Sequence, residues 1–214
     1  MKHSRILHAE FTAAAESLDH LPPPVSAEIA FAGRSNVGKS SVMNTLLERR
    51  GLVHTSATPG RTRKLGFFSV ETDDGARLLL VDLPGYGYAR RSKTERRAWG
   101  DLAEGYLLGR PVLRAVVLVL DVRRGAESDD LDLLELISDR PRVSRPPVAA
   151  IVVATKLDKL GRAAQKPALE RLSRALKRPV IGFSAPHGVG KDELWRKLRK
   201  AAGVEAPPGS PAER

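Results

Sequence analysis

The stretch Gly33-Arg34-Ser35-Asn36-Val37-Gly38-Lys39-Ser40 constrains the fold of this 214-residue chain more than any other. It matches the pattern G-x-x-x-x-G-K-[ST]. Residues 29–32 before it are apolar and suit a buried strand, and residues 41–47 after it can continue as a helix. A strand, a glycine-rich loop and a helix in this order form a phosphate-binding loop, because the loop N–H groups and the helix N-terminus converge on an anion.

Individual residues of this loop are assigned roles by their chemistry. Lys39 is predicted to reach the β- and γ-phosphates of a nucleoside triphosphate and to assist catalysis by neutralising their charge, and the Ser40 hydroxyl to bind Mg²⁺. The other residues from Gly33 to Ser41 complete the predicted phosphate site. The alternative is a glycine-rich turn that happens to end in Lys-Ser, which the flanking segments disfavour.

A second motif, Asp82-Leu83-Pro84-Gly85, follows residues 78–81, which read as another buried strand. A carboxylate at this position can hold Mg²⁺ through water, and the Gly85 N–H can sense a γ-phosphate. We therefore expect all four residues to line the nucleotide site. The alternative for Asp82 is a turn-initiating residue before Pro-Gly.

Between these motifs lies Thr58-Pro59-Gly60-Arg61-Thr62. A threonine can give its hydroxyl to Mg²⁺ and its N–H to the γ-phosphate, so that it reports whether this phosphate is present. Thr62 is preferred over Thr58, because it follows the Pro-Gly turn and precedes the next strand. Gly60, Arg61 and Thr62 are thus predicted to contact the nucleotide, with Thr62 also catalytic; the alternative is an ordinary polar loop.

The base is predicted to be read by Thr155-Lys156-Leu157-Asp158, which follows the apolar residues 151–154. Asp158 can accept hydrogen bonds from the ring N–H and exocyclic amine of guanine, a donor pair that adenine lacks. The Lys156 stem can lie along the base, and Thr155 stands where asparagine is usual. Ser184-Ala185 follows a further apolar segment and would present a backbone N–H to guanine O6. Together the motifs predict a GTPase.

Strands alternate with helices, and the chemical motifs lie at the carboxyl ends of apolar strands. This pattern predicts the three-layer α/β fold of phosphate-loop nucleoside triphosphatases, with a mainly parallel sheet. Residues 64–70 and 78–81 flank a turn at 73–75 and read as a hairpin, which adds one antiparallel edge strand.

The chain length suits one domain with short ends. The expected segments are an amino-terminal extension over 1–24, a GTPase domain over 25–202 and a disordered tail over 203–214. In the extension Ile6, Leu7, Phe11 and Ala14 share one helical face, which predicts a short helix. Later helices are expected to bury apolar stripes: Leu131, Leu134 and Ile137; Leu169, Leu172 and Leu176; and Leu194, Trp195 and Leu198.

The chain resembles the EngB (YihA/YsxC) family of ribosome-assembly GTPases over roughly residues 25–200. The residues that carry the resemblance are Phe31 to Ser41, Thr58 to Thr62, Asp82 to Ala89, Trp99-Gly100 and Thr155 to Asp158. The Tyr86-Gly87-Tyr88 extension and the T-K-x-D form of the base motif are specific to that family. The resemblance implies a protein that binds GTP, GDP and Mg²⁺, acts late in large-subunit assembly, and is needed for normal cell division and septation.

Two positions refine the expected mechanism. Tyr86 stands where Ras-like switches place the glutamine that orients the attacking water, so unaided hydrolysis is expected to be slow, with a partner supplying the missing group. Asn36 resembles the asparagine with which related GTPases hold a potassium ion beside the phosphates. The alternative for Asn36 is a loop residue that tolerates unusual dihedral angles.

The formal net charge of +11 is unevenly distributed. Residues 142–200 contain 15 Lys and Arg against four Asp and Glu, and residues 90–97 contain five cations and one acid. Such basic surfaces bind phosphate backbones without reading sequence. Together with the family resemblance, this implies ribosomal RNA of the large subunit as the partner. The alternative is a solvated face in an arginine-rich protein.

Composition also limits the cellular setting. The chain has no cysteine, which excludes disulfides and thiolate metal sites. No apolar run approaches the roughly 20 residues that a membrane span needs. A cytoplasmic monomer that does not associate with membranes is expected.

Two other functions fit part of these features. An ATP-dependent phosphotransferase could use the same loop with Arg61 and Arg63 on a lid, but the base motif argues against it. An RNA-binding module that holds nucleotide without turnover fits Tyr86. The variant Asp158→Asn distinguishes a GTPase from an ATP-dependent phosphotransferase. The GTPase would lose its preference for guanine, whereas the phosphotransferase would keep its activity.

Overall fold

The computed structural model describes residues 5–53, 64–86, 93–138 and 147–204, with only the backbone placed for 93–100. Within these ranges the strands are β1 (Ile6–Ala15), β2 (Ala27–Gly33), β3 (Leu65–Thr72), β4 (Arg77–Asp82), β5 (Leu113–Asp121), β6 (Ala149–Thr155) and β7 (Val180–Gly182). The α-helices are α1 (Lys39–Leu46), α2 (Lys93–Gly109), α3 (Ser128–Ser138), α4 (Arg162–Leu176) and α5 (Lys191–Ala202). No helix among these residues is both long and apolar enough to span a membrane.

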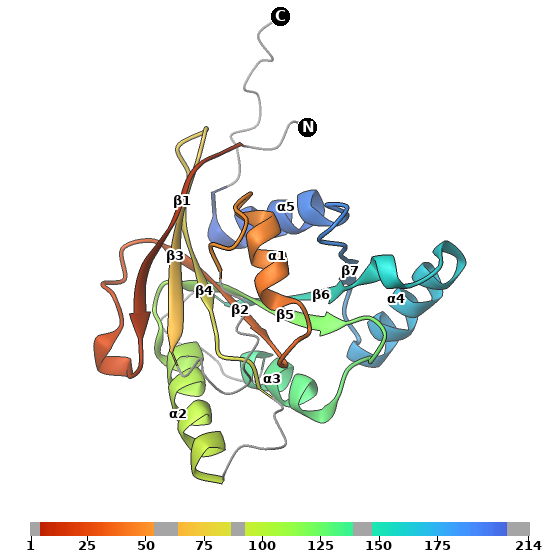
Figure 1. Cartoon of the computed structure of the whole chain (residues 1–214). Helices are drawn as coiled ribbons and strands as arrows, with labels where there is room; N and C mark the ends of the chain where they lie inside the picture. The colour runs from red at the N-terminus through yellow and green to blue at the C-terminus, as the bar shows by residue number, and fades with distance from the viewer. Residues whose placement is uncertain (1–4, 54–63, 87–92, 139–146, 205–214) are drawn as a thin grey trace, which may run out of the picture.

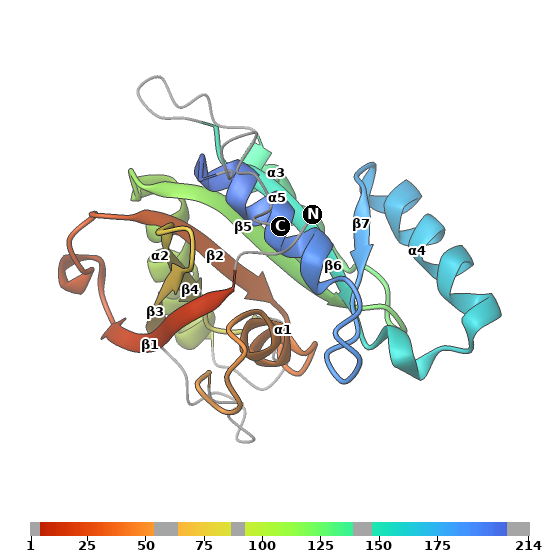
Figure 2. The ribbon, with the colours of Figure 1, turned by 90° about the horizontal axis from the view of Figure 1, so that it is seen from above.

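The strands form one sheet in the order β1-β3-β4-β2-β5-β6-β7. The neighbours from β4 to β7 pair in parallel, whereas β3 is antiparallel to both β4 and β1. The predicted α/β fold with a mainly parallel sheet is confirmed, as is the β3–β4 hairpin. Figures 1 and 2 show β1 at one edge of the sheet and β7 with α4 at the other.

The helix predicted near the amino terminus is wrong, because residues 6–15 form β1. This strand pairs with β3 in a register that runs from Ile6↔Thr72 to Ala15↔Leu65. The Phe11 ring packs edge-on against Phe68, with centroids 5.5 Å apart. Pairing satisfies the outer backbone groups of β3, and this gain outweighs the weak helical preference of a short segment.

Helices cover both faces of the sheet. α1 and α5 lie on one face, and α2 and α3 lie on the other (Figure 1). Side chains along β2 alternate between the two cores, so Phe31 packs with the first pair of helices and Ala32 with the second. Because the inner strands are buried on both faces, they read as continuous apolar runs.

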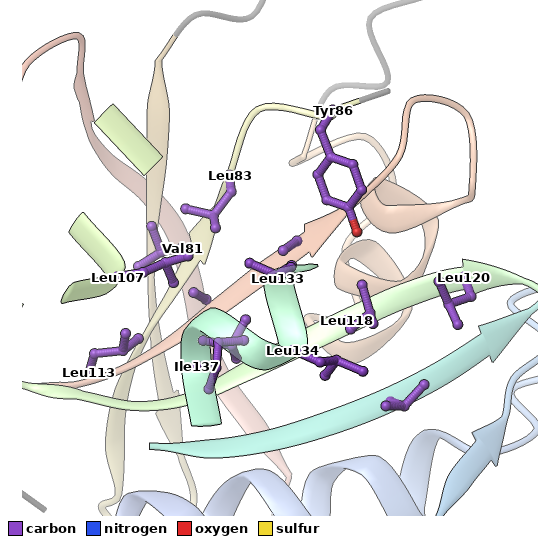
Figure 3. Packing of buried hydrophobic residues seen from close by; sticks show 14 of the residues in the cluster. Val81, Leu83, Tyr86, Leu107, Leu113, Leu118, Leu120, Leu133, Leu134 and Ile137 are labelled. Atoms are coloured by element: carbon purple, nitrogen blue, oxygen red, sulfur yellow. The ribbon is translucent and has the colours of Figure 1, made fainter. Parts of the chain in front are cut away.

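The predicted helical stripes are confirmed with one exception. Leu194, Trp195 and Leu198 of α5 are buried, as are Leu172 and Leu176 of α4, with Leu169 packed against the same core. In α3, Leu134 and Ile137 are buried, but Leu131 is 47% exposed and Leu133 faces the core instead. The apolar face of α3 is therefore rotated from the predicted one. Figure 3 shows Leu133, Leu134 and Ile137 against β5.

Candidate nucleotide-binding site

The phosphate loop connects the end of β2 to the start of α1. Gly33 lies so close to β5 that an added Cβ would stand 2.5 Å from the Val119 carbonyl oxygen, so only glycine fits. Asn36 and Gly38 have positive φ angles of 65° and 99°, which turn the loop towards the first residue of α1. The predicted strand, loop and helix are thus present as expected.

The parallel pairing of β2 with β4 brings the second motif to this loop. Phe31 is in register with Asp82, and the Leu83 N–H donates to the Phe31 carbonyl at 3.0 Å. Lys39 Nζ contacts Asp82 Oδ1, with both side chains nearly buried. Ser40 follows in the first turn of α1, so a hydroxyl and a carboxylate predicted to serve Mg²⁺ lie beside the phosphate-loop lysine.

Residues 84–86 fold onto the phosphate loop. An added Cβ on Gly85 would stand 3.0 Å from Ser35 Oγ and 3.2 Å from its backbone nitrogen. The Tyr86 N–H donates to the Gly33 carbonyl at 3.3 Å, and the Ser35 N–H donates to the Tyr86 carbonyl at 3.1 Å. The two motifs that were predicted to flank the γ-phosphate are therefore in direct contact.

The base motif is also tied to the phosphate loop. Thr155 Oγ1 lies 2.9 Å from the Leu120 carbonyl and contacts the Val37 carbonyl. Lys156 Nζ donates to the Asn36 carbonyl at 2.7 Å, so its aliphatic stem runs from the base motif to the phosphate loop. The threonine that replaces the usual asparagine thus forms a hydrogen bond to the neighbouring phosphate loop.

Asp121 supports this arrangement from the end of β5. It is buried and pairs with Lys156 at 3.0 Å and with Arg123 at 2.7 Å. Burial raises the pKa of Asp121, but hydrogen bonds from Arg123 and Lys156 outweigh it, so the pKa lies below its ordinary value. A carboxylate that stays ionised holds the Lys156 ammonium in place.

Asp158 lies just beyond β6, next to the Ser184 loop. Ser184 Oγ donates to Asp158 Oδ1 at 2.9 Å, and the Ser184 N–H donates to the Val189 carbonyl at 3.1 Å. Burial raises the pKa of Asp158, but the hydrogen bonds from Ser184 and the backbone and the nearby Lys159 outweigh it, so the pKa is lowered. An ionised carboxylate is the form that accepts from two guanine donors. The Ser184 N–H is already used, so Ala185 remains the residue predicted to present its N–H to guanine O6.

Two acidic residues at the amino end of α3 also belong to this site, although the sequence did not identify them as such. Arg34 of the phosphate loop pairs with Glu127, and the Tyr86 hydroxyl donates to Asp130 Oδ1 at 2.6 Å. From the sequence alone, Ser128-Asp129-Asp130 reads only as a possible helix cap. Gly60, Arg61 and Thr62 lie outside the described residues.

The fold and the arrangement of these motifs define a phosphate-loop GTPase. Residues 28–156 match the family model described as 50S ribosome-binding GTPase. A probable GTP-binding protein EngB from Desulfatibacillum aliphaticivorans is 44% identical over 199 residues, which cover 90% of this chain and 91% of the relative. A second, from Trichlorobacter lovleyi, is 46% identical over 189 residues, covering 87% and 91%. The chain belongs to the EngB family of GTP-binding proteins.

Solved structures agree on the fold. A crystal structure of a probable GTP-binding protein EngB superposes with a TM-score of 0.62 at 23% identity, covering 84% of this chain and all of that one. Aquifex aeolicus Era bound to GDP and AlF4⁻ gives 0.64 at 22% identity, covering 88% of this chain and 60% of Era. At these identities the structures support the architecture alone.

Proposed function

We propose that this GTPase is a slow, Mg²⁺-dependent switch that acts in assembly of the large ribosomal subunit. One observation carries the nucleotide part of the proposal: the base motif and the phosphate loop contact each other through Thr155 and Lys156. A base and a triphosphate of one nucleotide can then be held at the two ends of a single site. The ribosomal part rests on the description of the matched family as ribosome-binding.

The residues present fit Mg²⁺. Ser40 and Asp82 offer a hydroxyl and a carboxylate, and oxygen donors of this kind are what Mg²⁺ prefers beside phosphates. When bound, Mg²⁺ would neutralise charge on the phosphates during hydrolysis. In the proposed site Lys39 leaves Asp82 for the phosphates, Thr62 adds a further metal ligand, and Asp158 selects guanine.

Slow unaided hydrolysis is supported by the position of Tyr86. Its side chain is 6% exposed and its hydroxyl points to Asp130, away from the phosphate loop (Figure 3). In this arrangement Tyr86 cannot orient a water molecule at the γ-phosphate. We propose that the ribosomal particle supplies or orders the missing catalytic group.

The proposed docking surface is the outer face of α4. Together with the two residues that follow the helix, it carries six cations and one acid: Arg162, Lys166, Arg171, Arg174, Lys177 and Arg178 with Glu170. Within the described residues, no side-chain ion pair or hydrogen bond neutralises Arg162, Arg171, Arg174 or Lys177. In contrast, α5 pairs three of its cations, namely Lys191 with Glu48, Lys197 with Glu193 and Arg199 with Asp74. A row of unneutralised cations fits the phosphates of ribosomal RNA.

Potassium binding at Asn36 is a further part of the proposal. The φ angle of 65° at Asn36 also meets the alternative explanation, in which asparagine is needed for a left-handed turn. Comparing turnover in potassium with turnover in sodium decides between them. Equal rates would leave only the conformational role.

The direct test is GTP turnover with Mg²⁺, with and without purified large ribosomal subunits, and with ATP as the control. Slow turnover specific for GTP that rises with subunits supports the proposal. GTP binding without stimulation would instead favour a nucleotide-gated RNA-binding module. We further propose that the protein acts in the cytoplasm as a monomer, and that division and septation depend on it through ribosome supply.

A further inference from the structure

Tyr86 is bound at both ends, by its backbone to the phosphate loop and by its hydroxyl to α3. The proposed switch does not by itself require the hydroxyl contact. The Tyr86 backbone pairs with Gly33 and Ser35 of the phosphate loop at 3.3 and 3.1 Å. Its hydroxyl donates to Asp130 Oδ1 at 2.6 Å from within the core formed by Leu118, Leu133 and their neighbours (Figure 3). Burial and Asp130 raise the pKa of Tyr86 well above its ordinary value, so the hydroxyl remains a donor.

The acceptor is itself fixed. Asp130 is 1% exposed, and its second oxygen accepts from the Glu127 N–H at 2.8 Å, while the Asp130 N–H donates to the Glu127 carbonyl at 3.0 Å. This reciprocal pair caps α3 and prevents the carboxylate from following Tyr86 if the tyrosine moves. Arg34 pairs with Glu127, so the phosphate loop is attached to the same helix end.

The segment from Asp82 to Tyr86 thereby lies closed on the phosphate loop. Lys39 contacts Asp82, and Gly85 lies against Ser35. Yet in the proposed cycle Lys39 must contact the phosphates and the Gly85 N–H must contact the γ-phosphate. Either nucleotide requires Lys39 to leave Asp82, but only GTP has a γ-phosphate that requires Gly85 to move.

We propose that Tyr86 and Asp130 form a latch that stabilises the closed segment and so lowers the affinity for GTP relative to GDP. Both are positioning residues that act through Gly85, and the inference rests on the proposed switch function. A ligand shifts a conformational equilibrium only by its difference in affinity for the two states. Contacts that only the γ-phosphate displaces, namely those that hold Gly85 and Tyr86 against the phosphate loop, therefore oppose GTP and not GDP.

The test is the variant Tyr86→Phe, which removes the latch hydroxyl and keeps the ring in the core. Equilibrium affinities are measured for GDP and for a non-hydrolysable GTP analogue, each with Mg²⁺ and without ribosomes. The ratio of GTP-analogue affinity to GDP affinity is expected to rise about fivefold or more, as for ordinary coupling between sites, through tighter analogue binding alone. An unchanged ratio, or an equal change for both nucleotides, overturns the latch.

Tyr106→Phe is the matched control. Tyr106 is also buried, and its hydroxyl donates to a buried carboxylate, Glu28 Oε2, at 2.8 Å. That pair lies at the start of β2, at the opposite end of this strand from the phosphate loop. Tyr106→Phe should lower the melting temperature without changing the ratio of GTP-analogue affinity to GDP affinity. An equal change of this ratio in Tyr106→Phe and Tyr86→Phe would indicate a general loss of stability instead of a latch.

Asp130→Ala provides an independent variant, because it removes the carboxylate oxygen that accepts from the Tyr86 hydroxyl. It should shift the nucleotide ratio in the same direction, and Tyr86→Phe should add little in the double variant. Additive shifts would overturn the latch. The two proposals fail in different ways. Wild-type protein without a preference for guanine nucleotides would refute the proposed GTP switch. If only the latch is wrong, GTP turnover and its stimulation by ribosomal subunits are still observed.

Discussion

At the scale of single residues, the surroundings of Asp158 suit the role that we propose for it in binding guanine. Ser184 donates to one carboxylate oxygen, and the side chain is only 10% exposed. Because the pKa is lowered, the carboxylate is ionised at neutral pH and can accept from both guanine donors. The local sequence predicted this role, but the Ser184 hydroxyl bond required the fold.

We expect Asp158→Asn to weaken GTP binding about 10- to 100-fold, because hydrogen bonds to a charged acceptor contribute roughly 1.5–3 kcal/mol. The measurement is fluorescence titration with GTP and ATP, in which the preference for guanine should largely disappear. Lys159→Ala is the control, since Lys159 lies 3.6 Å from the carboxylate but is mostly exposed. If Asp158→Asn keeps its full preference for guanine, Asp158 does not bind the base.

Asp121 leads to a prediction about pH. Its folded-state pKa is depressed, so its stabilisation is present above the unfolded-state pKa, near 4, and is lost as the pH falls through the lower folded-state value. Asp121→Asn should therefore cost about 1–2 kcal/mol at pH 7, discounted because Arg123 is half exposed, and measurably less at pH 2, well below the unfolded-state pKa. Urea unfolding at both pH values tests this prediction. A difference in the free energy of unfolding between wild type and variant that does not change with pH would contradict it.

Among the elements, α2 is anchored at its carboxyl end by a buried ion pair. Arg110, just after the helix, contacts Glu28 of β2 at 2.5 Å, and its guanidinium also donates to the Pro22 carbonyl at 2.8 Å. Tyr106 donates to the same carboxylate. The end of α2 remote from the nucleotide is thus fixed to the sheet.

Arg110→Met should lower the free energy of unfolding by about 3–5 kcal/mol, because it leaves the buried Glu28 without its charge partner. Denaturant unfolding measures the loss. Arg77→Met is the control, since the Arg77–Glu71 pair is exposed and such pairs contribute at most about 1 kcal/mol. Similar losses in both variants would show that the buried Arg110–Glu28 pair contributes no more to stability than an exposed pair.

The basic face of α4 is tested by the double variant Arg171→Glu with Arg174→Glu. Binding to purified large subunits should fall at least about tenfold, with a shallower salt dependence, because each lost phosphate contact removes roughly 0.7–0.9 from the slope. The control, Arg196→Glu with Lys200→Glu, makes the same charge change on α5, on the other face of the sheet. Equal losses would indicate a general charge effect instead of a docking surface.

For the molecule as a whole, contiguous motifs were predictable and contacts between distant segments were not. The phosphate loop and the Asp158 motif each follow an apolar strand directly, so their place at the carboxyl ends of parallel strands could be predicted from the sequence. β1 was missed because the residues of β3 with which it pairs lie 50 or more positions away in the sequence. The Asp130 contact was missed because it joins two segments whose proximity depends on the β2–β4 and β2–β5 pairings.

Removal of residues 1–15 should destabilise the whole domain, because β3 would lose its outer partner and expose unpaired backbone groups. The melting temperature is expected to fall by about 5–10 °C, with more aggregation on heating. Calorimetry and light scattering measure both effects. Removal of residues 1–4 alone is the control, and equal behaviour of the two truncations would contradict a structural role for β1.

The pairing of β1 also orders events during synthesis. Its register joins Ile6 to Thr72, so the first strand to leave the ribosome has no partner until residues 65–72 have been translated and have emerged. Phe11, whose ring rests on Phe68, stays uncovered during that interval. The nascent chain therefore carries an unpaired apolar segment while the phosphate loop is already outside, and closure of this sheet edge must follow translation of β3.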